Sequence, residues 1–511
     1  MRLLFVAALA SALAGAAAAP AGARVVVAPR VVGNASDTFR FTGVNMDFWP
    51  TTKPKWNGAG ALIVDLTQPR LRTLARGLSG ALLRLGGSPA DFLLYDVSPD
   101  ACSAENLNKT QPVPGAHYFC PIWDQTAGQC LTLARWRSLL EFAGDAGLSL
   151  VLDLNACWGR KSASGDMDWS NIDGLLNVTA AARGTWGGAL WGVEFANEVY
   201  ENINATVYGR SAARLRARLD ALWAPPGPPA PRVMGPDAWE NDLSKAYYTE
   251  MLAASGGALH AVTVHDYADD CCASVGGNVL NVTCLDALFD NPAFVRDIAA
   301  ANGVATWNGE GALHAYSGVS GLTDTAVSTV YYLHALGSYA ERGIGLFSRQ
   351  TLIGGDYELV NRTTLAPTPD YYGLLLFRKL VGGAALATVA VAAPAGVRAH
   401  AFCALGAPGG VAVLLVNFAA AVGATVSIEW PTAPPSGAAA ELYTLTGVAG
   451  WADGDGASGL FRAALNNETL VFDGGLPVLT GTSVGAAADV WLPAVSATFV
   501  VWAGAGVGAC G

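Results

Sequence analysis

The sequence contains few charged residues. Asp, Glu, Lys and Arg make up only 14% of its 511 residues, and the formal net charge is −11. Proteins that bind nucleic acid or other acidic polymers need clustered basic residues, and such clusters are missing here. We therefore expect no nucleic-acid partner, and a sulfated polymer would have to be held by local contacts. The hydrophobic share of 52% predicts a folded chain with a large core.

Signatures of metal and phosphate binding are missing as well. The chain has no His-Glu-x-x-His sequence, no phosphate loop and no Cys-x-x-Cys pair. Cys271, Cys272, Cys284 and His265 offer zinc-ligand atoms, but their spacing does not fit a zinc site. We expect neither a metal nor a cofactor.

Long hydrophobic runs are confined to two places. Residues 3–19 follow Met1-Arg2 and precede small residues, which is the pattern of a signal peptide; we assign it to 1–19, with cleavage no later than residue 23. The run 411–428 is interrupted by polar residues and glycine, which predicts two strands. We therefore expect no transmembrane helix in the mature protein, and leave open its oligomeric state and a peripheral association with a membrane or cell wall.

Two further features favour the secretory pathway. Nine cysteines suit an oxidising compartment, and the odd number leaves at least one outside any intramolecular pair. Seven sequons are glycosylation candidates: Asn34, Asn108, Asn177, Asn204, Asn281, Asn361 and Asn467. The expected location is extracellular, including the cell wall, or a vacuole or lysosome.

The remaining pattern changes once along the chain. From residue 39 to residue 382, apolar runs that predict strands alternate with helical patterns in about eight units, the rhythm of a (β/α)8 barrel. After residue 382 the helical period disappears. Short runs rich in Val, Leu and Phe follow at 386–392, 411–418, 424–430, 470–472 and 497–502. They predict a β-sandwich over residues 383–511.

Two strand-like runs of the barrel region deliver acidic residues. The stretch 191–198 ends in Asn197-Glu198, and 305–310 ends in Glu310. Taken alone, Glu198 fits either the carboxyl end of a barrel strand or the first turn of a helix. Two carboxylates at the same end of a barrel suit cleavage of a glycosidic bond, which requires one proton donor and one negative group.

The pair of acids suggests a division of roles. We assign Glu198 as acid/base, with Asn197 placed to bond the 2-hydroxyl of the sugar, and Glu310 as nucleophile. In a retaining enzyme of this kind, which forms a covalent intermediate, the two carboxyl groups lie about 5 to 5.5 Å apart.

The ordered set of motifs resembles the heparanase family, glycoside hydrolase family 79, and within it the plant heparanase-like β-glucuronidases. The matching segments are VNMDFWP at 44–50, LRTLARGLSGALLRLGGSPADFLLYD at 71–96, CLTLARW at 130–136, ANE at 196–198, WNGE at 307–310, SRQTLIGGDYELVN at 348–361 and PDYYGLLLFRKLVG at 369–382. Together they extend over most of the chain.

The resemblance implies the fold and several site residues. The fold is a (β/α)8 barrel, residues 39–382, with a C-terminal β-sandwich that the N-terminal strand at 24–38 joins. Glu198 and Glu310 match the family's acid/base and nucleophile, and a disulfide between Cys403 and Cys510 is implied in the sandwich. The residues that match positions lining a glucuronate subsite are Asp47, Gln350, Gly355 and Tyr357. Each also has a structural alternative: a cap for Asp47, a turn for Gly355, a core position for Tyr357.

The sequence departs from the family pattern in two places. Ala196 stands where a glycine usually precedes Asn-Glu, and the spacing from Glu310 to Tyr316 is one residue longer than usual. Tyr316 is therefore a substrate-binding candidate with an uncertain alignment. His265 is a further candidate for the cleft or, equally, a structural histidine. Arg84 fits either an orienting role toward a catalytic carboxylate or a barrel salt bridge.

These patterns lead to a main hypothesis and two alternatives. The main one is a retaining, metal-independent β-glucuronidase that acts on glycans or small glucuronides. A retaining glycosidase for an uncharged sugar is the first alternative. The second is a non-catalytic secreted glycan-binding relative. A separation of more than roughly 10 Å between the Glu198 and Glu310 carboxylates would favour it.

Overall fold

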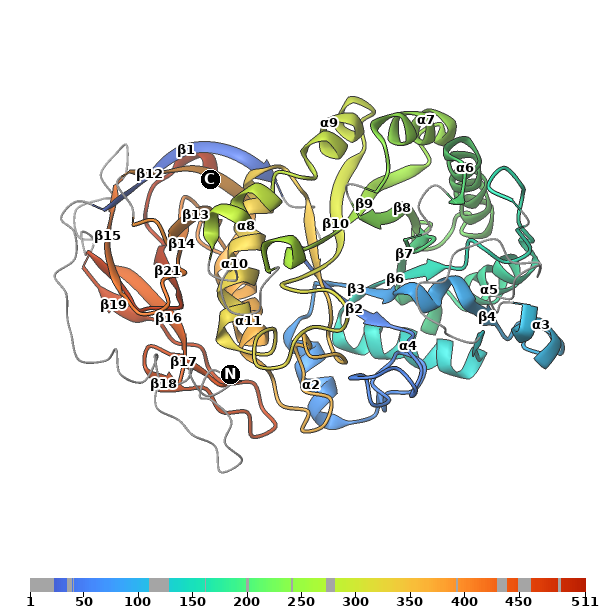
Figure 1. Ribbon diagram of the computed structural model, residues 1–511, viewed down its shortest axis with the longest axis horizontal. Helices are drawn as coiled ribbons and strands as arrows, with labels where there is room; N and C mark the ends of the chain where they lie inside the picture. The colour runs from blue at the N-terminus through green and yellow to red at the C-terminus, as the bar shows by residue number, and fades with distance from the viewer. Residues whose placement is uncertain are drawn as a thin grey trace.

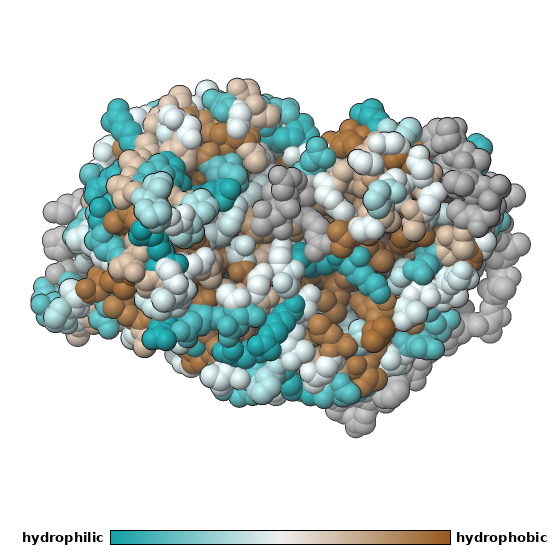
Figure 2. Space-filling view, turned by 180° about the vertical axis from the view of Figure 1, so that it is seen from behind, coloured by the Kyte–Doolittle hydropathy of each residue, from teal (hydrophilic) through white to brown (hydrophobic). Residues whose placement is uncertain are grey.

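The computed structural model describes most of the chain. Its described residues are 23–34, 39, 41–109, 128–160, 162–198, 202–239, 242–272, 281–391, 394–429, 439–448, 461–485 and 489–511. The predicted signal peptide, residues 1–19, lies outside them. No helix in these ranges is long and apolar enough to cross a membrane. Figure 2 shows hydrophilic and hydrophobic residues interleaved over the rear face, as is usual at protein surfaces.

Eight parallel strands close into a barrel, which confirms the predicted fold (Figure 1). In order around the barrel they are β2 (Phe41–Asp47), β3 (Leu82–Gly86), β6 (Ser149–Leu154), β7 (Leu190–Phe195), β8 (Arg232–Trp239), β9 (Leu259–Tyr267), β10 (Ala305–Ala312) and β11 (Leu346–Arg349). All residues of β2, β3 and β11 are buried, because side chains fill the barrel interior while helices cover its outer face.

Helices surround the barrel. They are α2 (Pro69–Gly77), α3 (Ala104–Lys109), α4 (Leu133–Ala146), α5 (Ser170–Ala181), α6 (Ala205–Leu222), α7 (Lys245–Ser255), α8 (Val282–Leu288), α9 (Ala293–Ala301), α10 (Ala326–Glu341) and α11 (Pro369–Leu380). Several begin at a side chain that caps free backbone N–H groups: Thr132 for α4, Asn204 for α6 and Ser244 for α7. Helix α4 ends at Gly147, whose φ of 69° suits a left-handed cap.

A second sheet of 11 strands forms the other lobe. It comprises β1 (Arg24–Asn34), β12 (Val381–Val391), β13 (Val397–Ala404), β14 (Val411–Asn417), β15 (Ala424–Glu429), β16 (Ala440–Gly447), β17 (Ala463–Leu465), β18 (Glu468–Thr469), β19 (Thr482–Val484), β20 (Val490–Leu492) and β21 (Ser496–Trp502). The N-terminal strand β1 pairs antiparallel with β12 and parallel with β15. Residues from eight of these strands share one buried cluster, so the sheet encloses its own core as a sandwich does.

Three local predictions differ from the structure. The sequence pattern predicts a proline-rich turn at 225–231 and the next strand only at 261–267, yet β8 lies between them. The Gly235-Pro236 pair in β8 argues against a strand in the sequence. The strand expected at 470–472 is wrong, because β18 ends at Thr469. The run expected to be helical from residue 130 begins as the short strand β5 (Gln129–Leu131), which pairs with β4 (Leu93–Tyr95).

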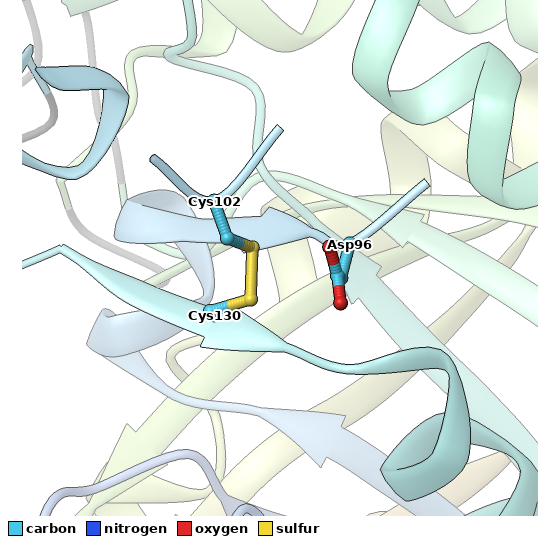
Figure 3. Close-up of side chains that lie close together, drawn as sticks. All are labelled: Asp96, Cys102 and Cys130. Carbon is cyan, nitrogen blue, oxygen red and sulfur yellow. A yellow bond between two sulfur atoms is a disulfide. The ribbon is translucent and has the colours of Figure 1, made fainter. Parts of the chain in front are cut away.

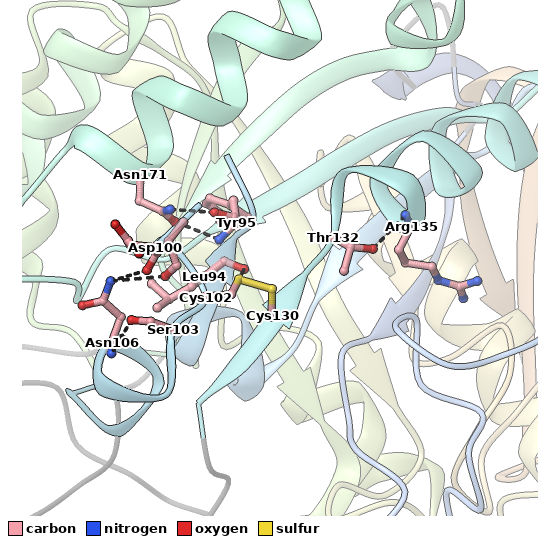
Figure 4. The surroundings of a disulfide bond; sticks show 11 residues. Leu94, Tyr95, Asp100, Cys102, Ser103, Asn106, Cys130, Thr132, Arg135 and Asn171 are labelled. Atoms are coloured by element: carbon pink, nitrogen blue, oxygen red, sulfur yellow. Dashed lines mark hydrogen bonds between the residues drawn. A yellow bond between two sulfur atoms is a disulfide. The ribbon is translucent and has the colours of Figure 1, made fainter. Parts of the chain in front are cut away.

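Disulfides tie loops to strands. Cys102 is bonded to Cys130 in β5, as Figures 3 and 4 show, and Cys271 is bonded to Cys284. A third bond joins Cys403 in β13 to Cys510, the pair that the resemblance implies. Such bonds persist in oxidising compartments, which is consistent with the secretory pathway.

The two lobes meet along α10. This helix is buried from Ala326 to Ala340 except at Val327, because the barrel covers one side and the sandwich the other. His400 of β13 lies against α10, with Nε2 2.9 Å from Nδ1 of His334. The contact requires Gly337: a Cβ there would lie 2.2 Å from the His400 ring.

We expect Gly337→Ala to destabilise the protein by about 1 to 3 kcal/mol, the usual effect of overpacking a close contact. Thermal or urea unfolding measures it. The matched control is Gly144→Ala in α4, where the added Cβ meets only Ala189 at 3.8 Å. Because Ala is the better helix former, this control should gain up to about 1 kcal/mol. Equal unfolding midpoints for the two variants would contradict the packing argument.

Candidate active site

The structure brings Glu198 and Glu310 together. Glu198 directly follows β7 and Glu310 lies near the carboxyl end of β10. One carboxylate oxygen of each lies within 4.8 Å of the other. Helix α6 begins only at Ala205, so the strand interpretation of 191–198 is confirmed and the helix-entry alternative is wrong.

A strained turn presents the Asn197-Glu198 pair. Ala196 has φ 73° and Glu198 φ 51°, a backbone region that residues with a Cβ rarely adopt. The three backbone N–H groups of the turn are fixed by neighbours: that of Ala196 by the Leu154 carbonyl, that of Asn197 by Asp91 Oδ2, and that of Glu198 by the Asp237 carbonyl. The positive φ gives a physical reason for glycine at position 196 in the family, and alanine there carries the strain.

Glu310 receives two strong donors. Arg84 Nη1 donates to its Oε2 at 2.8 Å, and the Tyr267 hydroxyl donates to its Oε1 at 2.5 Å. Burial and the Glu310 charge raise the pKa of Tyr267 well above its usual range, which keeps the phenol protonated as a donor. One charged and one neutral donor stabilise Glu310 in its anionic form.

Glu198 is held differently. Its Oε1 accepts from Trp239 Nε1 at 2.7 Å and lies 2.6 Å from His265 Nδ1. Its side chain is 15% exposed, whereas His265 has no exposed surface. The two carboxylates thus occupy different environments, the usual way in which acid and base roles are separated.

Arg84 lies at the centre of the buried charges. Besides Glu310, it contacts Glu194 at 2.6 Å, Asp153 at 3.4 Å and, closely, Asp237. Although burial alone disfavours the guanidinium, these carboxylates raise its pKa well above the usual value. Arg84 therefore acts both as an orienting group for Glu310 and as a barrel salt bridge, so the two alternatives from the sequence combine.

Carboxyl groups outnumber cations in this cluster. Burial, with Asp237 as a like charge, raises the pKa of Glu194 to about 7, and burial also raises that of Asp91 to about 7. Asp237 is the exception: burial opposes its charge, but Arg84 and His265 bring its pKa below the usual range. The cluster therefore holds protons near neutral pH.

Asp47 and Gln350 form a neighbouring group. Gln350 Nε2 donates to Asp47 Oδ2 at 2.6 Å and lies 3.3 Å from the Tyr357 hydroxyl. Trp49 Nε1 donates to the same Asp47 oxygen at 2.9 Å. Burial, then the charge of Glu310, raises the pKa of Asp47 to about 7. These contacts bring three of the predicted subsite residues into one hydrogen-bonded set.

Two glycines allow the loop after β11 to approach the site. A Cβ on Gly354 would lie 2.3 Å from the Trp56 ring, and one on Gly355 would lie 2.7 Å from Tyr357. The Gly355 N–H donates to the Lys55 carbonyl at 3.2 Å. Although Gly355 matches a subsite position, its N–H is thus engaged with the protein.

Aromatic side chains line the region between these groups. Trp49, Trp56, Tyr267 and Tyr357 share a buried cluster, with Trp239 packed against it. The ammonium of Lys53 lies 3.8 Å from the centre of the Trp49 ring. Burial lowers the pKa of Lys53, while the charge of Asp47 opposes that shift. Aromatic faces beside polar groups are typical of sugar-binding sites because they cover the apolar side of a pyranose ring.

The other predicted residues lie in varied places. His265 contacts Glu198 directly, whereas Tyr316 is 81% exposed.

Most sequon asparagines are exposed, and Asn361 is half-buried; the side chain of Asn108 lies outside the described set. The exposed sequons are Asn34, Asn177, Asn204, Asn281 and Asn467.

Sequence reasoning missed four residues that surround the acids. Tyr267 was seen only as part of a strand, and Glu194 as an ordinary strand residue. Asp237 and Trp239 lie on β8, the strand that the Gly-Pro pair concealed. The available signal was the polar residue at the end of each apolar run, the position where barrels place their chemistry.

Among the described residues, two groups have the spacing of metal ligands. In the first, Cys102 and Cys130 are bonded to each other beside Asp96, so neither sulfur is a free thiolate (Figure 3). Figure 4 shows the same bond beside the hydrogen bonds between Asn171 and Tyr95. The second group is Glu198, His265 and Glu310, whose atoms are close because Glu198 and His265 bond directly.

An eight-stranded parallel barrel with two adjacent carboxylates at the carboxyl ends of its strands defines a glycoside hydrolase. Residues 23–337 match the model of glycosyl hydrolase family 79, N-terminal domain, and the chain belongs to that family.

Similar proteins fit this assignment. Heparanase-like protein 1 of Arabidopsis thaliana is 28% identical, over 76% of this chain and 72% of its own length. Baicalin-beta-D-glucuronidase of Scutellaria baicalensis is 27% identical, over 79% and 78%. Among solved structures, a 4-O-alpha-L-rhamnosyl-beta-D-glucuronidase from Fusarium oxysporum is 16% identical, with a TM-score of 0.60 over 94% of this chain and 99% of its own. That structural likeness supports the fold.

The buried carboxyl groups predict how stability depends on pH. Asp47, Asp91 and Glu194 have folded pKa values of about 7 but titrate near 4 when unfolded, so folding takes up protons. The contribution of these three carboxyl groups to the free energy of unfolding is complete below about pH 4 and is lost as the pH rises through 7. Burial lowers the pKa of His260 and of His334 to about 4, so these two histidines make the folded protein less stable as the pH falls. They oppose the effect of the three carboxyl groups but are fewer. We expect a higher melting temperature at pH 5 than at pH 8.

The difference in melting temperature between pH 5 and pH 8 should be smaller in Asp91→Asn, because that variant lacks one of the titrating carboxyl groups. Asp297→Asn, whose side chain is 68% exposed, is the control and should keep the wild-type pH dependence. Differential scanning calorimetry across this range gives the result. A wild-type protein that becomes more stable from pH 5 to pH 8 would rule out this account.

Proposed function

We propose that the protein is a retaining β-glucuronidase with Glu310 as nucleophile and Glu198 as acid/base. The observation that carries the proposal is the pair of carboxylate oxygens within 4.8 Å of each other in unlike surroundings. This spacing fits a direct attack on the sugar and leaves no room for the water that an inverting enzyme places between its acids.

The environments support the two roles. Arg84 and Tyr267 hold Glu310 as an anion aimed at the anomeric carbon. Glu198, the more exposed acid, protonates the leaving oxygen in the first step and activates a water in the second. Asn197, whose Oδ1 accepts from Arg84 at 2.7 Å, directs its amide N–H groups to the 2-hydroxyl of the sugar.

A uronate is the proposed sugar. The Tyr357 hydroxyl and the Lys53 ammonium offer a donor and a positive charge beside Asp47 and Gln350, which suit a carboxylate and ring hydroxyls. Because the surrounding site is rich in carboxyl groups, an anionic sugar needs such a counter-charge. The similar proteins of Scutellaria and Fusarium are named as β-glucuronidases, which supports the same substrate class.

The proposed compartment is outside the cytosol. An N-terminal signal peptide at 1–19, the disulfides and five exposed sequons support extracellular, cell-wall, vacuolar or lysosomal residence.

Removing the acids tests the mechanism. Glu310→Gln should reduce turnover of an aryl β-glucuronide to background, because no nucleophile remains. Glu198→Ala should lower kcat/KM about 10²- to 10⁴-fold for a poor leaving group, and little for dinitrophenyl, which departs without a proton. NMR of the first product formed reports whether the β-configuration is retained.

The matched control is Glu141→Gln on α4, whose side chain is 43% exposed; it should keep wild-type rates. Wild-type activity in Glu310→Gln would refute the nucleophile assignment. A wild-type protein that binds glucuronides without turning them over would favour the glycan-binding alternative.

Specificity is tested by paired substrates. Tyr357→Phe and Lys53→Met should each lower kcat/KM for the glucuronide by about 10- to 100-fold, the effect of losing a charge-assisted bond, and leave the matched glucoside unchanged. Lys245→Met is the control, because Lys245 also lies over an aromatic ring, Phe294, but belongs to α7. A wild-type preference for the glucoside would instead support a glycosidase for an uncharged sugar.

A further inference from the structure

His265 bridges two carboxylates. Its Nδ1 lies 2.6 Å from Glu198 Oε1, and its Nε2 lies 2.7 Å from Asp237 Oδ1. The strand β9 carries it between β8, which bears Asp237, and β10, which bears Glu310. Its ring therefore lies among three acids from neighbouring strands, with Glu310 Oε2 at 4.0 Å.

This position is incompatible with substrate binding by the ring. His265 has no exposed surface, and both ring nitrogens face protein oxygens at hydrogen-bonding distance. A sugar hydroxyl could reach neither nitrogen without breaking one of those contacts. The interpretation of His265 as a residue that lines the cleft is therefore replaced by one in which it acts through Glu198.

The contacts also decide the charge of the ring. An imidazolium carries an N–H on both nitrogens, and it suits a ring whose Nδ1 contacts the Glu198 carboxyl and whose Nε2 lies at ion-pair distance from Asp237. Burial by itself opposes this charge, but Asp237, then Glu310, raise the pKa of His265 well above its usual value. Asp237 is well suited to hold the charge, because Arg84 also contacts its other oxygen and keeps it ionised.

Glu198 is held at one oxygen only. Both Trp239 and His265 contact Oε1, whereas no protein donor or acceptor among the described residues contacts Oε2 at hydrogen-bonding distance. The carboxyl group is therefore fixed in rotation, with one oxygen anchored and the other left for the reaction.

We propose that His265, held as a cation by Asp237, is the positioning residue of the acid: it anchors Glu198 Oε1 so that Oε2 delivers its proton to the glycosidic oxygen, and its charge favours that delivery. The inference rests on the acid/base role proposed above for Glu198.

The proton balance of the step is simple. Glu198 Oε2–H gives its proton to the departing oxygen while the C1–O bond breaks and Glu310 bonds to C1. Glu198 is left as a carboxylate beside the imidazolium, which stabilises the new negative charge in a buried site. His265 keeps both of its protons throughout, so it acts neither as a base nor as a relay.

The test is the leaving-group dependence of kcat/KM in His265→Gln. The constant kcat/KM reports the first chemical step, and the substrates are aryl glycosides of whichever sugar the wild type hydrolyses. We expect a decrease of about 10- to 100-fold for a poor leaving group such as phenol, less than about threefold for dinitrophenol, and an unchanged KM. The plot against leaving-group pKa becomes steeper, as it should for Glu198→Gln.

His260→Gln is the matched control. His260 lies on the same strand, but its ring packs against Trp191 and Trp307, away from the acids. His260→Gln should keep the wild-type dependence of kcat/KM on the pKa of the leaving group. A structural role for His265 would lower all rates equally, and a substrate-binding role would raise KM for all substrates; either outcome overturns the proposal. A Glu198→Gln protein without any leaving-group dependence would refute the acid/base role, and the proposal with it.

A second measurement does not require the variant to fold. In wild-type protein with ¹⁵N-labelled histidine, the His265 ring should give two protonated nitrogen signals from about pH 5 to pH 8. Two protonated nitrogens at pH 8 distinguish the His265 ring from those of His260 and His334, whose pKa values of about 4 keep them neutral over the same range. A neutral ring with one bare nitrogen at any pH in it would overturn the proposal.

Discussion

The buried guanidinium of Arg84 is the charge on which the reactive end of the barrel depends. It contacts carboxylates from three strands besides that of Glu310, and the amide oxygen of Asn197. Without it these acids would face one another in a low-dielectric interior, where like charges repel strongly. Arg84 therefore explains how so many acids coexist, and it gives Glu310 a charged hydrogen-bond donor.

The same cluster separates the functions of the two catalytic candidates. Glu310 takes its donors from Arg84 and Tyr267, on the interior side of the barrel. Glu198 contacts Trp239 and His265, both through its Oε1. The proposal that the two glutamates have two roles therefore rests on a difference in surroundings rather than in residue type. The family assignment and the proposed chemistry agree on this point.

The sequence was most informative where a pattern has a single physical cause. A strand such as β10, apolar at its start and ended by polar residues, fits the pattern of barrel strands with their chemistry at the carboxyl end. It was least informative at β8, where Gly235-Pro236 breaks the strand pattern, although the barrel supplies enough pairing on both sides to hold it. The strand expected at 470–472 failed for the opposite reason, because an apolar run alone specifies no partner strand.

By itself, the sequence determined the barrel, the sandwich and the two glutamates, because these follow from periodicity and from motifs in a fixed order. Only the tertiary structure decided which of those residues contact one another. Nothing in the chain order relates His265 to Asp237 and Glu198, or Arg84 to four acids, since these contacts join residues that lie tens to hundreds of positions apart. The closure of the barrel brings them together, and burial then gives their charges an effect that they lack in the open chain.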